Sequence, residues 1–423
     1  MTTSAPFRAA GWWGTGPSPA GDSWDSSALL QSAGQVSTAG FNQIPGNLGG
    51  TSMPQAYEPQ PGTPMAELDT PCLILDMDAL DHNMDVIADY YEGRHSKLRG
   101  HSKNHKSPAL ALRQIQRGGT IGGVCAAKVA EAEVMVQGGV ASVFVTSEVV
   151  AQPKIARLCA LADQAEILVA CENETNARDL SQAAADQGVN LGVVIEQETG
   201  LLRCGVQEGE DGVGSGVALA RLIDSLPGLS LKGVMSHQMM AEVSGDLEDR
   251  VSELRRLVQP VLDLREAMLA DGLPVEIVST GETWSYDVAG DMPEVTEIQG
   301  GSYLVMETSY DYIQDFHLAG KVLSTIVSVP RPGTAIGDAG ARAVCGIKGL
   351  PRVEGRPGVE AVAMDTDRTV FQVAEGAELA VGDQVLLLPG QQDAMVSRWD
   401  RFIGIRDGMV EAVWDIEARG CHN

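Results

Sequence analysis

One lysine stands in a setting that favours nucleophilic chemistry. Lys103 lies in the run Lys97-Leu-Arg-Gly-His-Ser-Lys-Asn-His-Lys106, which also holds two histidines and three other cations. Crowded positive charge and partial burial both disfavour the ammonium form of a lysine. An uncharged lysine amine can attack an aldehyde, such as that of pyridoxal phosphate. An isolated basic run is more often a surface loop, so the rest of the sequence has to decide between the two.

Small residues that suit phosphate binding follow two predicted strands further along the chain. After Glu276–Ser279 and within Glu297–Leu304, the sequence supplies Gly281, Thr283, Gly300, Gly301 and Ser302. Main-chain N–H groups in such loops can face a phosphate, and barrel enzymes place these loops after their last two strands. A glycine pair alone is more often a plain turn. Two such loops in one chain with a candidate nucleophile favour phosphate binding.

The elements that position these residues alternate between short apolar runs and amphipathic helices. The predicted strands are Leu98–Lys103, Ile121–Ala126, Ser142–Thr146, Glu166–Ala170, Leu191–Glu196, Leu231–His237, Glu276–Ser279 and Glu297–Leu304. Helical spacing of apolar residues marks Lys128–Gln137, Glu174–Gln187 and Leu247–Ala270. This α/β pattern predicts a (β/α)8 barrel of the triosephosphate isomerase type. An open doubly wound sheet is the alternative, but no Gly-x-Gly-x-x-Gly follows the first strand.

Two further polar residues come at predicted strand ends, where barrel enzymes keep their reactive groups. Arg203 follows the fifth strand in Glu196-Gln-Glu-Thr-Gly-Leu-Leu-Arg-Cys-Gly205, and His237 ends the sixth. A lone histidine is more often a satisfied core residue, but its place at a strand end favours a functional role for His237.

The chain changes character after Tyr310, where strands are linked by Gly, Pro and Asp turns. The predicted strands are Val322–Val329, Ala341–Ile347, Val359–Asp365, Gln384–Leu388, Phe402–Arg406 and Met409–Ile416, and Arg406-Asp-Gly-Met409 is a tight hairpin. The expected domains are therefore an extended Gly/Pro/Ser-rich arm over 1–65, the barrel over 66–316 and a smaller β domain over 317–423. Trp12 and Trp13 in the arm could anchor it to a neighbouring surface, although a solvated tail is the ordinary alternative.

Composition excludes several classes of protein. With 423 residues, 44% hydrophobic content and a formal net charge of −27, the chain is expected to be globular and to bind neither nucleic acid nor membrane. No apolar run reaches the length of a membrane-spanning helix, and the N-terminus lacks the pattern of a signal peptide, so a cytoplasmic location is expected. Seven scattered cysteines show no paired metal spacing and should be reduced.

These residues together resemble a known family. The segments are Gly100-His-Ser-Lys-Asn-His-Lys-Ser107, Thr70-Pro-Cys-Leu-Ile-Leu75, Gly122-Gly-Val-Cys125, Ala130-Glu-Ala-Glu133, Arg203-Cys-Gly-Val206 and Gln299-Gly-Gly-Ser-Tyr303. From about Leu68 to the C-terminus the chain resembles the D-threonine aldolase and D-serine dehydratase family, and within it the 3-hydroxy-D-aspartate aldolases. The resemblance implies a fold-type III pyridoxal phosphate enzyme with an alanine racemase-like barrel, a C-terminal β domain and a homodimeric assembly.

The resemblance also implies roles for individual residues. Lys103 matches the Schiff-base lysine, and Arg203 matches an arginine beside the pyridine nitrogen. Beside these matches, His101 and His105 flank Lys103 and could tune it, and His101 is expected to contact the cofactor. An arginine there keeps the nitrogen unprotonated, which makes the electron sink milder. A structural ion pair with Glu196 or Glu198 is an equal alternative for Arg203. His237 stands where the family has a tyrosine, and could act as a base or stack on the ring.

The sequence departs from the family at the metal site. In Pro389-Gly-Gln-Gln-Asp393, Gln391 replaces the family's metal-binding histidine while Asp393 keeps the second ligand. A neutral amide oxygen is a weak donor, so zinc binding should suffer most. Magnesium, manganese or calcium is expected to bind weakly or not at all.

The expected activity is cleavage or formation of the Cα–Cβ bond of a β-hydroxy-D-amino acid, of the D-threonine or 3-hydroxy-D-aspartate type, with pyridoxal 5′-phosphate as cofactor. A D-amino acid dehydratase or racemase is the alternative on the same fold, and dehydration is disfavoured because it relies on a metal to expel hydroxide. A pyridoxal phosphate-binding protein without catalysis is the alternative from a different class.

Overall fold

The computed structural model of the chain describes residues 57–207, 209–238 and 246–423. The expectations for Trp12 and Trp13 concern residues outside this part. Among the helices in the described residues, none combines the length and the apolar character needed to cross a membrane.

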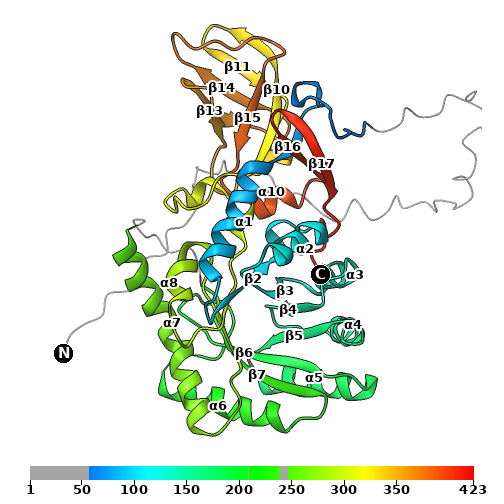
Figure 1. Ribbon diagram of the computed structural model, residues 1–423, viewed down its shortest axis with the longest axis vertical. Coiled ribbons are helices and arrows are strands. Elements are labelled where there is room, and N and C mark those ends of the chain that lie inside the picture. Colours follow the sequence, from blue (N-terminus) through cyan, green and yellow to red (C-terminus); the bar gives the residue numbers. More distant parts are fainter. Residues whose placement is uncertain (1–56, 208, 239–245) are drawn as a thin grey trace, which may run out of the picture. The chain divides into compact units, whose positions relative to one another are not determined.

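The described residues contain a closed barrel of parallel strands, which is drawn in cyan to green in Figure 1 and confirms the predicted fold. Its strands in order are β2 (Lys97–His101), β3 (Thr120–Ala126), β4 (Ser142–Val145), β5 (Glu166–Cys171), β6 (Leu191–Glu196), β7 (Leu229–Met235), β8 (Ile277–Thr280) and β9 (Glu297–Ile298). The last strand, β9, pairs with both β8 and β2 and so closes the barrel. Closure brings residues near 101 and residues near 300 together at one end.

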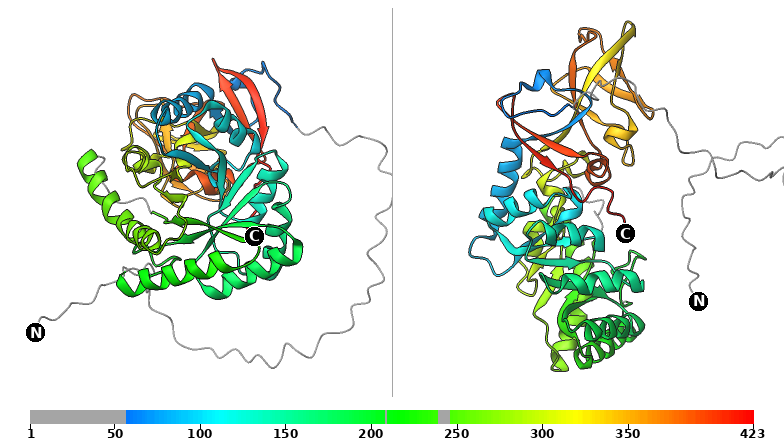
Figure 2. Two further views of the ribbon diagram at one scale, coloured as in Figure 1. Left: turned by 60° about the horizontal axis from the view of Figure 1, so that its bottom comes forward. Right: turned by 90° about the vertical axis from the view of Figure 1, so that its right-hand side faces the viewer.

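Helices connect the strands and cover the outside of the barrel (Figure 2). They are α1 (Met77–Tyr91), α2 (Pro108–Arg117), α3 (Val129–Gln137), α4 (Gln152–Leu161), α5 (Glu174–Gln187), α6 (Glu210–Ser225), α7 (Leu247–Ala270) and α8 (Tyr286–Gly290). Helix α5 shows how local sequence sets their ends. Asn173 caps it by accepting a hydrogen bond from the Asn176 N–H at 2.9 Å, and Gly188 ends it with a φ of 68°.

A buried ion pair lies at the seam where the barrel closes. The Arg99 guanidinium on β2 donates two hydrogen bonds of 2.8 Å to the Glu297 carboxylate on β9. A third bond of 3.0 Å goes to Ser142 Oγ on β4. The side chains of Arg99 and Glu297 are only 2% and 6% exposed. A bidentate pair of this kind fixes the relative position of the two strands.

The C-terminal part forms a mostly antiparallel sheet in the order β13-β14-β11-β10-β1-β16-β17, with β15 beside β10 and β12 beside β15. Its strands are β1 (Cys72–Asp76), β10 (Gly320–Arg331), β11 (Thr334–Gly337), β12 (Arg352–Glu354), β13 (Val359–Met364), β14 (Thr369–Val373), β15 (Gln384–Leu388), β16 (Arg401–Arg406) and β17 (Met409–Asp415). The chain end returns to the barrel, where the Ala130 N–H donates to Asn423 O at 2.9 Å.

The structure corrects the expected division of the chain. Strand β1 pairs with β10 and β16 in the C-terminal sheet, although a boundary at residue 66 assigned this segment to the barrel. The end of the expected arm is also attached to this sheet, because the Gly62 N–H donates to Val410 O at 2.8 Å. Apolar strand residues alone do not show which of two sheets they join.

Several predicted elements differ locally from the structure. The strand predicted over Ala341–Ile347 is wrong, because Ala341–Val344 form a short helix, α9, followed by a loop. Strand β9 spans only two residues of the predicted Glu297–Leu304, since the glycines after it turn the chain into a 3₁₀ helix. The predicted hairpin is confirmed: Arg406 pairs with Met409 across Asp407 and Gly408, which have φ values of 51° and 73°.

We expect the seam ion pair to be essential for stability. Arg99→Met leaves the buried Glu297 carboxylate without its partner, which should cost about 3–5 kcal/mol of unfolding free energy in a denaturant titration. The exposed pair of Arg178 and Glu174 is the control, and Arg178→Ala should cost less than about 1 kcal/mol. Equal losses in the two variants would contradict this assignment.

Candidate active site

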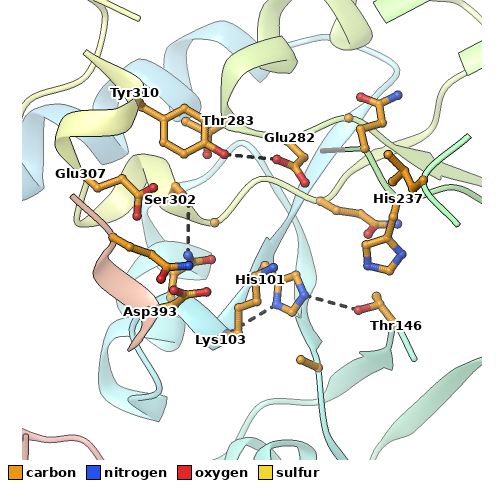
Figure 3. Close-up of a pocket in the computed structure, with 18 of the residues that line it drawn as sticks. His101, Lys103, Thr146, His237, Glu282, Thr283, Ser302, Glu307, Tyr310 and Asp393 are labelled. Atoms are coloured by element: carbon orange, nitrogen blue, oxygen red, sulfur yellow. Dashed lines mark hydrogen bonds between the residues drawn. The ribbon is translucent and has the colours of Figure 1, made fainter. Parts of the chain in front are cut away.

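A cavity of about 550 Å³ lies at the carboxyl ends of the barrel strands and extends to the C-terminal part. The predicted site residues that line it are His101, Lys103, Arg203, His237, Gly281, Thr283, Gly301, Ser302, Gln391 and Asp393. Gly300 is not among the lining residues, although it lies beside them in the same loop. Residues from distant parts of the sequence are thus brought to one place (Figure 3).

Lys103 follows β2 in a 3₁₀ turn that spans Ser102–Asn104. The turn is held on both sides: Ser102 Oγ donates to Cys125 O at 2.8 Å, and Asn104 Nδ2 donates to Ser302 Oγ at 3.3 Å. The Lys103 N–H points to His101 Nδ1 at 3.4 Å. The turn therefore holds the lysine main chain while its half-buried side chain faces the cavity.

The other cations of the basic run are paired away from Lys103. Arg99 pairs with Glu297 inside the barrel, and Lys106 pairs with the buried carboxylate of Glu131. Lys97 donates to the carbonyl oxygen of Tyr91. The crowding expected from the sequence is thus reduced by these partners, because strand and turn geometry sends neighbouring side chains in different directions.

His101 is a buried neutral imidazole next to the lysine. Burial, followed by the positive charge of Lys103, lowers the pKa of His101 well below its ordinary value. Its Nε2 lies 3.4 Å from Thr146 Oγ1 at the end of β4. An uncharged ring can lie against a flat cofactor, and adds no charge repulsion to the lysine. His105, by contrast, is fully buried and does not line the cavity.

His237, Glu196 and Arg203 form a linked group on one side of the cavity. His237 lies two residues past the end of β7, and its Nδ1 is 2.9 Å from Glu196 Oε1. Burial, followed by the charge of Arg203, lowers the pKa of His237 well below its ordinary value. A neutral ring that donates from Nδ1 to Glu196 leaves Nε2 as a hydrogen-bond acceptor.

Arg203 both lies beside the carboxylate of Glu196 and lines the cavity, so the ion pair and the place beside a cofactor that the sequence suggested are compatible. Its Nη1 lies 3.7 Å from Glu196 Oε1, and its side chain also lines the cavity. Glu198 is not its partner, because that carboxylate accepts the N–H groups of Gly200, Leu201 and Leu202. The arginine is therefore held by one carboxylate and still available to a ligand.

Sequence reasoning missed a group of acidic residues behind His237. Burial, followed by contact with Glu196, raises the pKa of Glu148 to about 7. Burial also raises the pKa of Glu196. Glu148, Glu172 and Cys204 each place one possible ligand atom within 4.8 Å of the others. Glu172 directly follows β5, and Glu148 lies three residues past the end of β4. This position near strand ends is the signal that could have indicated them.

The two glycine loops meet in the cavity wall. Gly281 has a φ of 81°, which favours glycine, and a Cβ at Gly301 would lie 2.1 Å from Asn104 Oδ1. The Tyr303 N–H donates to Thr283 Oγ1 at 3.0 Å and joins the two loops. Glycines here allow the loops after β8 and β9 to pack closely around the turn that carries Lys103.

A separate wall of the cavity comes from the residues after β9 and from the C-terminal part. We call Glu307, Lys348, Gln391 and Asp393 the C-terminal wall. Sequence reasoning missed Glu307 and Lys348, as well as Tyr310 and Glu282 beside them, because no local pattern marks them. Tyr310 donates to Glu282 Oε2 at 3.2 Å, and burial raises the pKa of Glu282. Figure 3 shows Asp393 and His237 on opposite sides of Lys103.

Comparison with known proteins agrees with this geometry. Residues 75–309 match the model of the alanine racemase N-terminal domain, and residues 319–405 match that of a serine dehydratase domain. The chain is 35% identical over 371 residues to a 3-hydroxy-D-aspartate aldolase of Paracoccus denitrificans (strain Pd 1222). The aligned region covers 85% of this chain and 94% of the relative. The chain belongs to the D-threonine aldolase and D-serine dehydratase family. The resemblance seen in the sequence is thus confirmed.

Two further relatives of this family extend the comparison. A D-threonine aldolase of Arthrobacter sp is 32% identical over 367 residues, covering 85% of this chain and 95% of the relative. The crystal structure of D-threonine aldolase from Filomicrobium marinum has a TM-score of 0.81 at 32% identity, covering 86% of this chain and 99% of that one. The family depends on pyridoxal phosphate, and the chain is a lyase of this family.

The cavity residues fit pyridoxal phosphate. The volume of the cavity is within the usual range for small-molecule sites, about 300–1,000 Å³. Lys103 provides an amine, the loops of Thr283 and Ser302 provide hydroxyl and N–H donors, and Arg203 provides a cation on the opposite side. An aldehyde, a phosphate and a ring nitrogen are the groups that such a donor set suits.

Lys103 is expected to carry the cofactor. Lys103→Ala should shift the visible absorbance of the purified, cofactor-loaded protein to that of free pyridoxal phosphate, because no other amine takes its place in the turn after β2. Lys97→Ala is the control, since Lys97 begins the same strand and donates to the carbonyl oxygen of Tyr91 at the end of α1. An unchanged spectrum in Lys103→Ala would rule out the assignment.

The buried imidazoles predict a loss of stability in acid. Burial lowers the pKa of His105 to about 3, and that of His101 also falls, so both rings stay neutral in the folded protein. The unfolded chain binds these protons below about pH 6.5 and is thereby stabilised. The free energy of unfolding should therefore fall as the pH drops from about 6.5 to about 4. Urea titrations of His105→Asn should show a shallower fall, and an identical slope would contradict the burial of this ring.

Proposed function

We propose that the protein is a pyridoxal phosphate-dependent aldolase that cleaves or forms the Cα–Cβ bond of a β-hydroxy-D-amino acid, of the D-threonine or 3-hydroxy-D-aspartate type. The observation that carries the proposal is the placement of Lys103 between two different walls. His237 lies on one side and Asp393 on the other (Figure 3), and Arg203 shares the Glu196 carboxylate with His237. The names of the two curated relatives support the same reaction class.

In this proposal the cofactor is held by residues from four strand ends. Lys103 would bind its aldehyde carbon, and the loops of Gly281, Thr283, Gly301 and Ser302, with the adjacent Gly300, would hold its phosphate. His101 and Arg203 would hold its ring. When bound, the cofactor supplies an electron-withdrawing ring that stabilises negative charge at the substrate Cα.

Side chains of the protein accept the proton and position the proton acceptor. His237 is a neutral imidazole with Nδ1 bound to Glu196, so its Nε2 can accept a proton from the substrate. Glu196 is a positioning residue, because it fixes the ring and its tautomer.

Gln391 and Asp393 do not fit a firmly bound divalent ion. They offer one neutral oxygen and one carboxylate, and Asp393 belongs to no group of three or more histidine, cysteine or carboxylate ligands in the described residues. Magnesium, manganese and calcium prefer six or more oxygen ligands, with several carboxylates among them for calcium. We therefore assign no step to a metal at this site. The small-molecule substrate and the homodimeric state expected from the sequence belong to the same proposal.

The side chains of the C-terminal wall also favour aldol cleavage over dehydration. A dehydratase expels the β-hydroxyl as hydroxide, for which a Lewis acid at that oxygen is the usual aid. The C-terminal wall keeps a carboxylate there, and a carboxylate takes a proton from a hydroxyl more readily than it helps hydroxide to leave. An aldol cleavage is thus favoured over elimination.

Aldehyde release tests the proposal directly. The cofactor-loaded protein should release glyoxylate from 3-hydroxy-D-aspartate or acetaldehyde from D-threonine, with glycine as the second product in both cases. Activity should stay within about twofold when manganese is added, because the ligand set is incomplete. Pyruvate from D-serine without any aldehyde would place the chain among the dehydratases, and no turnover with retained cofactor absorbance would indicate a binding protein.

A further inference from the structure

Lys348 brings a positive charge to the wall where Gln391 and Asp393 lie. It stands in the loop between α9 and β12, and its side chain lines the cavity. Its Nζ donates to Glu307 Oε1 at 3.3 Å and to Ser309 Oγ at 3.2 Å. About a third of the side chain is exposed. Three donor hydrogens on the ammonium leave capacity for a ligand oxygen as well.

Glu307 ties the lysine to the segment that carries the two wall residues. Its Oε1 accepts from Lys348, and its Oε2 accepts the Gln392 N–H at 2.8 Å. The two segments also touch through their main chains, since a Cβ at Gly390 would lie 2.9 Å from Lys348 O. Glu307 is itself buried. The ammonium and the Gln391–Asp393 pair are therefore held together by one carboxylate and one glycine contact.

Gln391 supplies a second sign of a ligand at this wall. Its Oε1 is buried and has no hydrogen-bond partner within the described part of the chain. An unpartnered buried amide oxygen costs free energy unless a bound molecule satisfies it. The wall thus combines a free acceptor, a carboxylate and an ammonium around a cavity that faces Lys103.

We propose that the Lys348 ammonium supplies the positive charge that a divalent ion would otherwise bring to this wall, and that Asp393 takes the proton of the substrate β-hydroxyl. The proposal rests on the aldolase function proposed above. A hydroxyl group needs one acceptor for its hydrogen and gains from one cationic donor to its oxygen. Asp393 and Lys348 meet these two needs, and His237 remains available on the opposite side of Lys103.

The bond changes balance without any further reactant. The β-hydroxyl proton passes to the Asp393 carboxylate, and the oxygen electrons form the carbonyl bond of the aldehyde. The Cα–Cβ bond breaks, and its electron pair stays on the Cα fragment, which later gains a proton to become glycine. Lys348 stabilises the oxygen while it carries negative charge and keeps its own proton.

Divalent-ion binding decides whether Lys348 occupies the place of the metal. Mn²⁺ should be titrated by calorimetry into four cofactor-loaded proteins without substrate: wild type, Gln391→His, Lys348→Met and the double variant. The wild type should bind no ion at this wall. The double variant should bind Mn²⁺ at least about tenfold more tightly than Gln391→His, because a neighbouring ammonium repels the ion.

Two results of this titration would overturn the proposal. One is stoichiometric Mn²⁺ binding by the wild type that Asp393→Asn abolishes, since the metal site would then be intact. The other is equal Mn²⁺ affinity in Gln391→His and the double variant, since Lys348 would then not influence an ion at this wall. Both results are independent of catalysis.

Kinetics test the role of the ammonium in the reaction. Lys348→Met should lower kcat by about 10²-fold, with a smaller change in KM, while Lys348→Arg should restore part of the loss. Lys232→Met is the matched control, because Lys232 pairs with Glu276 and does not line the cavity. Equal kcat in Lys348→Met and wild type would overturn the proposal.

The two proposals can fail separately. Absence of aldehyde release by the wild type would end the aldolase assignment, and the Mn²⁺ titration would still decide whether Lys348 excludes an ion from the wall. Aldehyde release that a chelator abolishes would keep the aldolase assignment and overturn the role of Lys348.

Discussion

The structure depends on the seam where the first and last strands of the barrel meet. The bidentate contact between Arg99 and Glu297 holds β2 beside β9 in the barrel interior. Each of these strands ends in part of the active site: β2 leads into the turn of Lys103, and β9 leads into the loop of Gly301 and Ser302. The Lys103 amine and the loop of Gly301 and Ser302, which lie far apart in the sequence, therefore become neighbours where β2 pairs with β9, and the buried ion pair supports this pairing.

The site joins two walls of different chemical character. On the barrel side, burial keeps His101 and His237 uncharged, so this wall offers flat neutral rings with a single guanidinium. The C-terminal wall offers an ammonium and carboxylates. A flat aromatic cofactor suits the first wall, and a polar substrate group that exchanges a proton suits the second. The two walls differ because burial in the barrel lowers the pKa of the two histidines and keeps their rings neutral.

Much of this could be predicted from the sequence, and the failures have physical causes. The barrel follows from apolar runs that alternate with helices, and Lys103, Arg203 and His237 follow from their places near strand ends. Lys348 and Glu307 could not be found in this way, because their meeting with Gln391 depends on contacts between distant loops. The segment Ala341–Ile347 was expected to be a strand because its composition is apolar. Its short helix is instead stabilised by the Ala341 and Arg342 N–H groups, which donate to Asp365 O and Thr366 O.

The pairing of β1 shapes how the polypeptide can be divided. This strand lies between β10 and β16, whose residues come more than two hundred positions later. During synthesis the strand must wait for most of the chain before its neighbours exist, so the sheet is among the last elements to assemble. A fragment that stops after the barrel would present β1 with both edges open to other chains. A single cut between the barrel and the C-terminal sheet would therefore separate β1 from both of its partner strands.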